Sequence, residues 1–469
     1  MRSKKRSQDV NYNINSMSKT NNENRVTKIP GNLANSQTID LNVRSYAGYA
    51  ETNVHGIKGN LFYWFFESQE FSPQNLGDEK EIAKTPLIIW LNGGPGASST
   101  LGLLLENGPY RMSQEQLGNL AENSYTWNKN AHIMYWDQPF GTGYSYSENS
   151  NSEQVYVKNE DELSEIFYHA LLNFYSKHPQ YSNCPLYITG ESYGGKYVPN
   201  IAAKIHSKNV NKNNSIKIPL QGIAVVDGWI DSKRQIRIYI DYAYSLGYID
   251  TNQKQIIDKD YDSFCMALKN GQWNDAYQIS NNIVANVSAM GGNFNVYDIR
   301  TFSDVSMDNV RTYMSLPEVK KALNIPKEQP WNCADNDGPV ATNLIEDNMI
   351  DSSDKYTEII NHAELYKVLI CTGTFDTACG SLSTEKILYD LKKWDSSSDE
   401  IWKTIERKIW AQPSNQTKGF VKQYKNLTQI VFPNSGHQVP YYLPETSLEM
   451  IEKWIQGIEF PSYSPPLKK

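Results

Sequence analysis

Short, dense apolar runs separated by turn residues recur along most of this chain. Uninterrupted apolar runs of this length are typical of strands that are buried on both faces of a sheet. The runs are Leu61–Phe66, Pro86–Leu91, His132–Trp136, Leu186–Thr189, Gly222–Val226, Val368–Cys371 and Ile430–Phe432. We expect each of them to form a strand of one central sheet.

Segments with apolar residues at helical spacing separate several of these runs. The segment from Glu153 to His178 repeats apolar side chains along one helical face and predicts a long helix. A second helix is expected after Gly195, because Val198, Ile201 and Ile205 recur three and four residues apart. Strands that alternate with helices are typical of an α/β fold with a mainly parallel central sheet and helices on both faces.

Two parts of the chain lack this alternation. Residues 1–37 are polar and rich in Asn and Ser, and they predict a disordered tail before one catalytic domain of residues 38–469. Between about Gly228 and Arg311 the chain is polar and mostly helical in pattern, as in Ile236–Tyr248. We expect this insertion to form a mostly helical cap beside a ligand site at one end of the sheet.

Composition narrows the class of protein only modestly. The formal net charge of −7 argues against nucleic acid as the main partner. No apolar run approaches the roughly 18 residues needed to span a bilayer, so no membrane span is expected. The basic N-terminal segment lacks the apolar stretch of a secretory signal. Five scattered cysteines do not define a disulfide scaffold, and the compartment stays open.

The most informative motif is the segment Gly190–Gly195, with the sequence GESYGG, between a predicted strand and a predicted helix. A Gly-x-Ser-x-Gly pattern on such a turn exposes the serine hydroxyl, and its glycines allow the strand and the helix to approach closely. The motif therefore predicts that Ser192 is a nucleophile.

A nucleophilic serine needs a base to take its proton and an acid to orient that base. The strand Val368–Cys371 leads into Asp376, and the strand Ile430–Phe432 leads into His437. Acid and base thus follow the serine in the order expected for this kind of sheet, each on a loop after a strand. We predict a triad of Ser192, Asp376 and His437.

An acyl-transfer reaction also needs two backbone N–H groups that bind the developing oxyanion. Tyr193, the residue after the nucleophile, supplies the first. The glycine-rich loop Trp90–Gly96 supplies the second, at Gly94. A phosphate-binding loop is disfavoured, because Pro95 removes a donor and no Gly-Lys-Ser/Thr sequence follows.

At these motifs the chain resembles the serine carboxypeptidases, which include lysosomal and vacuolar enzymes. The resemblance runs from about Asp40 to Trp454. It rests on ordered blocks at Trp90–Gly96 with Ser98–Ser99, Glu106–Pro109, Asp137–Pro139, Gly143–Tyr146, Gly190–Pro199, Gly228–Asp231, Asn295–Arg300, Asp376 with Cys379, and Gly436–His437 with Val439–Pro440. It implies an α/β-hydrolase fold and serine-type carboxypeptidase activity through an acyl-enzyme, without a metal or an organic cofactor.

The resemblance also implies a site for the free carboxylate at the C-terminus of a peptide substrate. Asn92 and the Gly93 amide would bind this carboxylate, together with Glu191 and a second carboxyl group, Glu106, bonded to it. A carboxyl group donates a hydrogen bond only while it is protonated, and two close Glu side chains do not readily both ionise. One pKa should therefore rise, and hydrolysis should be favoured at acid pH.

Three positions depart from the family pattern. Ala97 replaces a cysteine whose disulfide partner aligns with Cys333, Thr374 replaces an acidic residue, and Gln438 replaces a methionine beside the catalytic histidine. None of these changes removes a catalytic group. Because of Gln438, however, the specificity of the leaving-side pocket cannot be transferred from the family.

Two alternative functions stay open. An acyltransferase would keep the triad and transfer the acyl group to an alcohol. A catalytically silent scaffold or binding protein would fit the missing signal and the lost cysteine. The carboxylate-binding residues favour a peptidase, with peptide or protein C-termini as partners and an unassigned oligomeric state. The resemblance points to a lysosomal, vacuolar or secreted enzyme.

Overall fold

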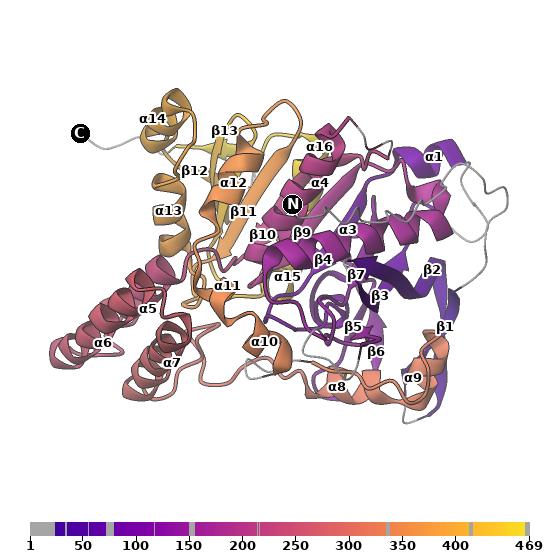
Figure 1. Ribbon diagram of the computed structural model, residues 1–469, viewed down its shortest axis with the longest axis horizontal. Coiled ribbons are helices and arrows are strands. Elements are labelled where there is room, and N and C mark those ends of the chain that lie inside the picture. Colours follow the sequence, from indigo (N-terminus) through magenta and orange to yellow (C-terminus); the bar gives the residue numbers. More distant parts are fainter. Residues whose placement is uncertain are drawn as a thin grey trace, which may run out of the picture.

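A single large sheet organises the molecule (Figure 1). The computed structural model describes residues 24–32, 35–54, 56–71, 79–116, 118–149, 155–212, 214, 216–333, 338–411 and 416–464. The main path of the 13-stranded sheet has the order β1 (Arg25–Asn32), β2 (Gln37–Val54), β3 (Ile57–Phe66), β7 (His132–Trp136), β4 (Leu87–Leu91), β9 (Leu186–Glu191), β10 (Leu220–Val226), β11 (Lys367–Gly373), β14 (Leu427–Phe432), β13 (Thr417–Tyr424), β12 (Lys408–Ala411) and β15 (Ser462–Tyr463).

All of the predicted strands lie in this sheet. From β7 to β14 the neighbouring strands run parallel, which confirms the predicted parallel sheet at its centre. The flanking strands pair antiparallel, so the sheet as a whole is mixed. Three short strands complete the set in the described residues: β8 (Tyr146–Ser147) pairs with β3, and β5 (Tyr110–Met112) pairs with β6 (Leu120–Glu122).

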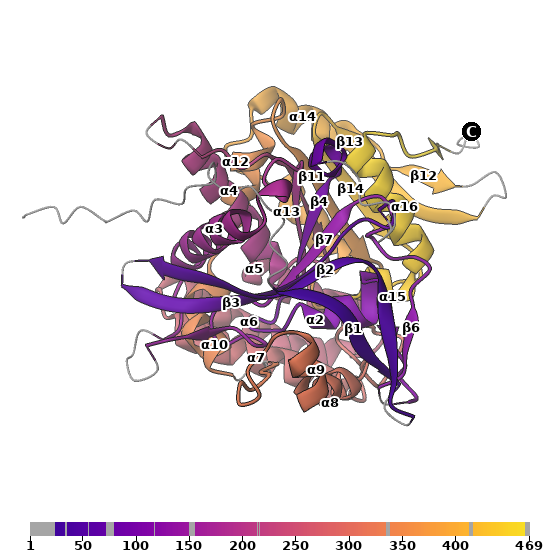
Figure 2. The same ribbon diagram turned by 90° about the vertical axis from the view of Figure 1, so that its right-hand side faces the viewer.

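Helices cover both faces of the sheet. Because successive side chains of a strand point to opposite faces, each central strand contributes apolar residues to two separate core layers. Ile223 and Val225 of β10 join one core cluster, and Ala224 and Val226 join the other. Figure 2 shows α3, α4 and α12 on one side of the sheet and α16 on the other. The first layer contains α3 (Glu160–Lys177), α4 (Gly194–Val210), α12 (Ser353–Ile360), α13 (Ser381–Tyr389) and α14 (Ser396–Thr404), and the second contains α2 (Thr100–Gly102), the π-helix η2 (Leu103–Asn107), α15 (Val439–Tyr442) and α16 (Pro444–Gln456).

The segment between β10 and β11 holds a third group of helices, α5 (Ser232–Ser245), α6 (Thr251–Lys269) and α7 (Trp273–Met290). They share their own apolar cluster, which includes Ile240, Phe264 and Ile283. In Figure 1 these helices project beyond one end of the sheet.

Helices continue beyond the predicted end of the insertion at Arg311. These are α8 (Asp308–Ser315), α9 (Pro317–Ala322), α10 (Pro339–Asn343) and α11 (Ile345–Met349). Each has only five to eight residues, too few turns for a helical period to show in the sequence. Two further short helices, α1 (Glu79–Lys84) and η3 (Pro179–Tyr181), lie outside this segment. None of the helices in the described residues is long and apolar enough to cross a bilayer.

The predicted disorder of residues 1–37 is wrong for residues 25–32, which form β1 against β2. Val26 and Ile29 of this strand are buried. These two apolar residues are three positions apart in the sequence, so the strand lacks the alternating pattern by which it would be recognised. A register shift between Val26 and Lys28 lets both side chains be buried despite this spacing. Residues 1–23, 33 and 34 lie outside the described residues.

The helix predicted from Glu153 to His178 begins later than expected. The α3 helix starts at Glu160, where the Asn159 side chain accepts a hydrogen bond from the Glu162 amide at 2.9 Å. This side-chain cap fixes the helix start, and residues 155–159 are not helical. Residues 153 and 154 lie outside the described residues.

Candidate active site

The predicted nucleophile lies on a sharp turn between β9 and α4. Ser192 has a φ of +60°, which is rare for a residue other than glycine and orients its side chain away from the strand. A Cβ added at Gly190 would lie 2.8 Å from the Leu91 carbonyl oxygen, and one at Gly195 would lie 2.7 Å from the Trp229 amide nitrogen. The glycines of the motif therefore allow the neighbouring backbone segments to approach closely, as the sequence predicted.

The predicted base and acid are bonded to each other. His437 Nδ1 lies 2.8 Å from Asp376 Oδ2, and both side chains are buried. Because a carboxylate only accepts, Nδ1 carries the hydrogen and Nε2 is left with a free lone pair. Burial lowers the pKa of His437, but the charge and hydrogen bond of Asp376 outweigh it, so the pKa lies above its ordinary value.

The Asp376 carboxylate is itself held by backbone donors. Its Oδ1 accepts from the Ala378 amide at 2.8 Å, and its Oδ2 accepts from the Cys379 amide at 3.1 Å. Ser192 and His437 line a common cavity of about 270 Å³. The structure thus brings the three predicted residues into one place, from the ends of β9, β11 and β14.

The glycine-rich loop lies directly against the nucleophile turn. A Cβ on Gly93 would lie 2.2 Å from the Tyr193 amide nitrogen, and Gly94 has a φ of +103°. Within the described residues, the amides of Gly94 and Tyr193 donate to no backbone or side-chain acceptor. Both predicted oxyanion donors are therefore available to a ligand, and both residues line a second cavity of about 530 Å³.

Asn92 fixes the position of Glu191. Its Oδ1 accepts from the Trp90 indole N–H at 2.8 Å and from the Gly102 amide at 2.9 Å. These two donors set the orientation of the side-chain amide, so Nδ2 faces Glu191 and donates to Oε1 at 3.4 Å. Asn92 and Glu191 both line the 270 Å³ cavity.

Glu106 and Glu191 form a buried pair of carboxyl groups. Glu106 is 0% exposed and Glu191 is 4% exposed. Burial raises the pKa of both groups, and the charge of Glu106 raises that of Glu191 further. Neither forms a salt bridge with a cation in the described part of the chain. The pair is therefore expected to keep a proton well above the ordinary range of a carboxyl group.

Three residues beside the candidate triad had no role in the sequence prediction. Tyr297 accepts a hydrogen bond from the His437 amide at 2.8 Å, and its ring lies 4.8 Å from the imidazole, centre to centre. Asp304 also lines the 270 Å³ cavity, and it lies on a loop in which the sequence showed no motif. Asp227 directly follows the buried strand β10. Asp376 was predicted from the same signal, a polar residue after a buried strand, so this signal could have identified Asp227 as well.

The second cavity, of about 530 Å³, also borders the nucleophile. Ser192, Gly94 and Tyr297 line both cavities. Helices α5 and α7 of the cap contribute half of the remaining lining residues, which are Ile236, Tyr239, Tyr277, Ser280, Asn281, Val284, Ala285 and Ser288. Ser192 thus borders both a small cavity with acidic residues and a larger, mainly apolar cavity under α7.

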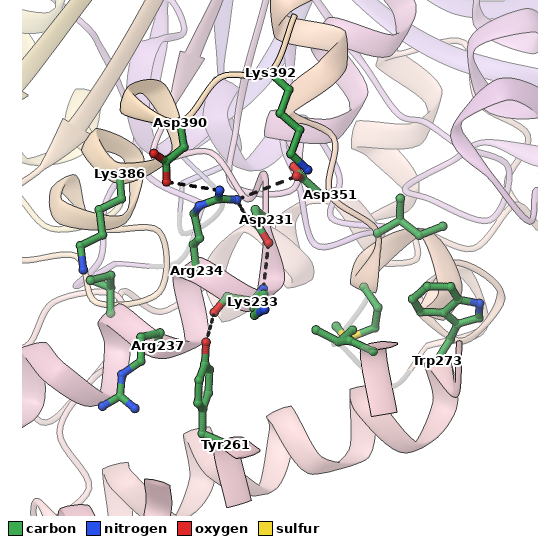
Figure 3. A pocket seen from close by; sticks show the side chains of 14 residues that line it. Asp231, Lys233, Arg234, Arg237, Tyr261, Trp273, Asp351, Lys386, Asp390 and Lys392 are labelled. Carbon is green, nitrogen blue, oxygen red and sulfur yellow. Dashed lines mark hydrogen bonds and ion pairs between the residues drawn. The ribbon is translucent and has the colours of Figure 1, made fainter. Parts of the chain in front are cut away.

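A third cavity, of about 610 Å³, lies between the cap and α13 and holds none of the predicted site residues (Figure 3). Arg234 of α5 contacts three carboxylates there: Asp231, Asp390 at 3.4 Å and Asp351 at 3.9 Å. Asp351 precedes α12 and Asp390 follows α13, so these ion pairs connect the cap to the helices on the sheet.

The structure shows the surroundings of the three residues that depart from the family pattern. Ala97 carries no thiol, and it packs with Cys333 against the same core cluster. Thr374 donates from its hydroxyl to the Phe432 carbonyl at 2.8 Å, which connects the loops after β11 and β14. Gln438 lines the small cavity beside His437.

A serine at a strand–turn–helix elbow, on a central parallel sheet covered by helices, defines an α/β hydrolase. A family model for serine carboxypeptidases matches residues 30–457. The chain is 31% identical over 431 residues to the human "Probable serine carboxypeptidase CPVL", covering 89% of this chain and 84% of the relative. It is 34% identical over 439 residues to "Serine carboxypeptidase S10 family member 1" of Dictyostelium discoideum, covering 91% and 96%. The chain therefore belongs to the serine carboxypeptidase family, whose members are hydrolases of peptide substrates.

The fold comparison agrees with this assignment. The structure is similar to that of Kex1(delta)p, a prohormone-processing carboxypeptidase from Saccharomyces cerevisiae, with a TM-score of 0.77 and 22% sequence identity. The match covers 94% of this chain and 97% of the yeast chain. At this identity the similarity establishes the fold, and the residues of the site stand on their own geometry.

Proposed function

We propose that Ser192, Asp376 and His437 form the catalytic triad of a carboxypeptidase that releases the C-terminal residue of peptides. The observation that carries the proposal is the 270 Å³ cavity, which Ser192 and His437 line together with Asn92 and Glu191. The residues proposed as nucleophile, base and carboxylate site therefore surround one space large enough for an amino-acid side chain.

The reaction follows from the hydrogen bonds. Ser192 Oγ attacks the last peptide carbonyl while His437 Nε2 takes the hydroxyl proton, and Asp376 stabilises the imidazolium. The amides of Gly94 and Tyr193 bind the oxyanion. His437 returns the proton to the departing amino acid, and the acyl-enzyme forms. Water then attacks the acyl-enzyme with His437 as base, which releases the shortened peptide and restores the serine.

Recognition of the chain end is assigned to the acidic pair and its neighbours. The Asn92 side chain and the Gly93 amide donate to the substrate carboxylate, and a carboxyl group of Glu191, held by Glu106, donates a third hydrogen bond while it is protonated. As pH rises through the raised pKa of the pair, this donor is lost and a negative charge faces the carboxylate. KM should therefore rise with pH.

The larger cavity under α7 is assigned to the residue that precedes the scissile bond. Its wall of Tyr239, Tyr277 and Val284 favours an apolar or aromatic side chain there. The raised pKa of the acidic pair also favours work in an acidic compartment, so we propose a lysosomal, vacuolar or secreted enzyme.

The decisive test uses a blocked dipeptide in two forms, one with a free C-terminal carboxylate and one with a C-terminal amide. The wild type should release the terminal residue from the free acid and hardly act on the amide. Ser192→Ala should lower kcat by about 10⁴-fold or more, as in other serine hydrolases. Ser397→Ala, at an exposed serine, is the matched control and should keep full activity. Turnover by Ser192→Ala near that of the wild type would refute the assignment.

The same assay separates the two alternatives. An acyltransferase would pass the acyl group to an added alcohol in preference to water. A silent scaffold would show no turnover, and Ser192 would not react with an active-site organophosphonate at mildly acidic or neutral pH.

A further inference from the structure

A second buried aspartate lies beside the proposed triad. Asp227 follows β10 directly, is 0% exposed and has a φ of +44°. Its amide donates to the Cys371 carbonyl at 2.8 Å, and its Oδ1 accepts from the Gly373 amide at 2.8 Å. The side chain is therefore fixed along the end of β11, where the loop that carries Asp376 begins.

The backbone on either side of Asp227 holds the nucleophile turn. The Val226 carbonyl accepts from the Ser192 amide at 3.1 Å, and the Trp229 amide donates to the Ser192 carbonyl at 2.7 Å. Asp227 thus lies between the segment that carries the proposed nucleophile and the segment that carries its acid.

The second oxygen of Asp227 has no donor. Oδ2 is buried, and no N–H or O–H group of the described residues reaches it. No Lys, Arg or His in that part of the chain forms a salt bridge with it either. A buried carboxylate without a cation is costly, so Asp227 is expected to be a neutral carboxylic acid with one hydrogen to donate.

The groups that face Asp227 are all acidic or neutral. Asp376 lies within hydrogen-bonding contact, and Glu106 acts on Asp227 from a greater distance. The remaining titratable neighbours are Glu191 of the nucleophile turn and the thiols of Cys371 and Cys379. Asp376 is the acceptor suited to the Asp227 hydrogen, because it is bonded to His437 and acts as an anion in the triad.

We propose that Asp227 is a positioning residue of the triad, a carboxylic acid that donates a hydrogen bond from Oδ2 to the Asp376 carboxylate. This inference rests on the triad of the proposed function. Two backbone amides, His437 Nδ1–H and the Asp227 hydrogen then surround Asp376. The extra donor keeps Asp376 in place and leaves a single negative charge behind the imidazole.

The arrangement makes the triad sensitive to alkaline pH. Burial and the neighbouring Asp376 raise the pKa of Asp227 well above its ordinary value. As pH rises through this value, Asp227 loses its proton, the hydrogen bond disappears and two carboxylates repel each other. Activity that depends on the triad alone should therefore fall on the alkaline side, independently of the carboxylate-binding pair.

An ester substrate isolates this effect. N-benzoyl-tyrosine ethyl ester has no free carboxylate, so its hydrolysis reports on the triad and not on recognition of a chain end. Asp227→Asn keeps a donor and tolerates the positive φ, whereas Asp227→Gly tolerates the φ and has no donor. We expect Asp227→Asn to keep kcat within about threefold at acid pH and to lose the alkaline decline. Asp227→Gly should lower kcat by roughly 10- to 100-fold with little change in KM.

Asp354→Asn, at an exposed aspartate, is the control for removal of a negative charge and should keep the wild-type profile. Should Asp227→Gly fail to fold, the low-field NMR signal of the His437 Nδ1 proton provides a second readout. In the wild type this signal should shift as pH rises through the Asp227 pKa, and in Asp227→Asn it should not.

Two results would overturn the inference: an Asp227→Asn variant with the wild-type alkaline decline on the ester, or equal kcat values for the Gly and Asn variants. Failure of the proposed function looks different. In that case the wild type itself hydrolyses neither the ester nor the blocked dipeptide.

Discussion

At the scale of single residues, hydrogen bonds decide which carboxyl groups of the site are charged. Asp376 receives donors on both oxygens and lies beside an imidazole, which suits an anion. Glu106 is fully buried beside the second carboxyl group, Glu191, which suits a neutral acid. Carboxyl groups of one site thus take opposite states, as in enzymes whose paired acids divide their roles.

Asp304 is expected to influence which residue is released. It lines the 270 Å³ cavity, which we assign to the side chain of the released residue. A Lys or Arg side chain at the substrate C-terminus would gain an ion pair there. Because an exposed pair contributes up to about 1 kcal/mol, Asp304→Asn should lower the preference for Lys over Leu by roughly fivefold.

The measurement for Asp304 is kcat/KM for two blocked dipeptides that differ only in the C-terminal Lys or Leu. Asp308→Asn removes one negative charge nearby, at the start of α8. It is the control and should leave the ratio unchanged. An Asp304→Asn ratio equal to that of the wild type would show that Asp304 does not contact the released side chain.

At the scale of elements, the sequence was sufficient for the buried strands and for the nucleophile turn. Continuous apolar runs such as Pro86–Leu91 identify central strands, because both faces of these strands are covered. The elbow was predictable because Ser192 and its flanking glycines form a local pattern whose geometry does not depend on distant residues.

Elements whose stability depends on distant contacts could not be predicted in this way. The β1 strand depends on pairing with β2 and on contacts of Val26 and Ile29, and the spacing of these two residues does not follow the alternating pattern. Asp227 was missed for a related reason, because its role depends on Asp376, which lies on the loop after the adjacent strand β11. Such pairings between segments far apart in sequence leave no local periodicity.

The contribution of β1 to stability can be measured directly. Ile29 is 1% exposed, so Ile29→Ala should lower the free energy of unfolding by about 2–5 kcal/mol, as for other buried aliphatic residues. Thr27→Ala, on the exposed face of the same strand, should change it by less than about 0.5 kcal/mol. Urea denaturation followed by tryptophan fluorescence compares the two variants, and equal values would mean that β1 does not belong to the cooperative core.

At the scale of the whole molecule, the catalytic arrangement depends on contacts between segments of several layers. Glu191 and Asp227 lie at the carboxyl ends of β9 and β10, and the loops after β11 and β14 carry Asp376 and His437. These groups come together because the carboxyl ends of parallel strands meet at one edge of a sheet. The cap forms one wall of the larger cavity, and Arg234 connects it to the helices on the sheet. Access to the nucleophile is thus set by elements that fold around a separate apolar cluster.

The buried acids give the folded protein a characteristic dependence on pH. Burial raises the pKa of Glu106, Glu160, Glu191 and Asp227, and it raises that of Asp137 to about 7 from an ordinary value of 3.8. In the unfolded chain these groups ionise near their ordinary pKa. Between the ordinary and the raised value the folded state binds more protons, so the free energy of unfolding falls as pH rises.

These carboxyl groups therefore lower stability as pH rises toward neutral and alkaline values. The buried His132 and His178 act in the opposite direction up to about pH 6.5, because burial lowers their pKa to about 3. For a single group inside its window, such as Asp137 between about pH 4 and 7, the loss is about 1.4 kcal/mol for each pH unit. Glu165 limits stability on the other side, because its lowered pKa makes its contribution disappear in strong acid. Urea unfolding at pH 5, 6, 7 and 8 tests the expectation, because Asp137→Asn should remove a loss of about 1.4 kcal/mol for each pH unit between pH 5 and 7. An Asp137→Asn variant with the same change in the free energy of unfolding as the wild type over this range would mean that Asp137 is already ionised in the folded protein at pH 5.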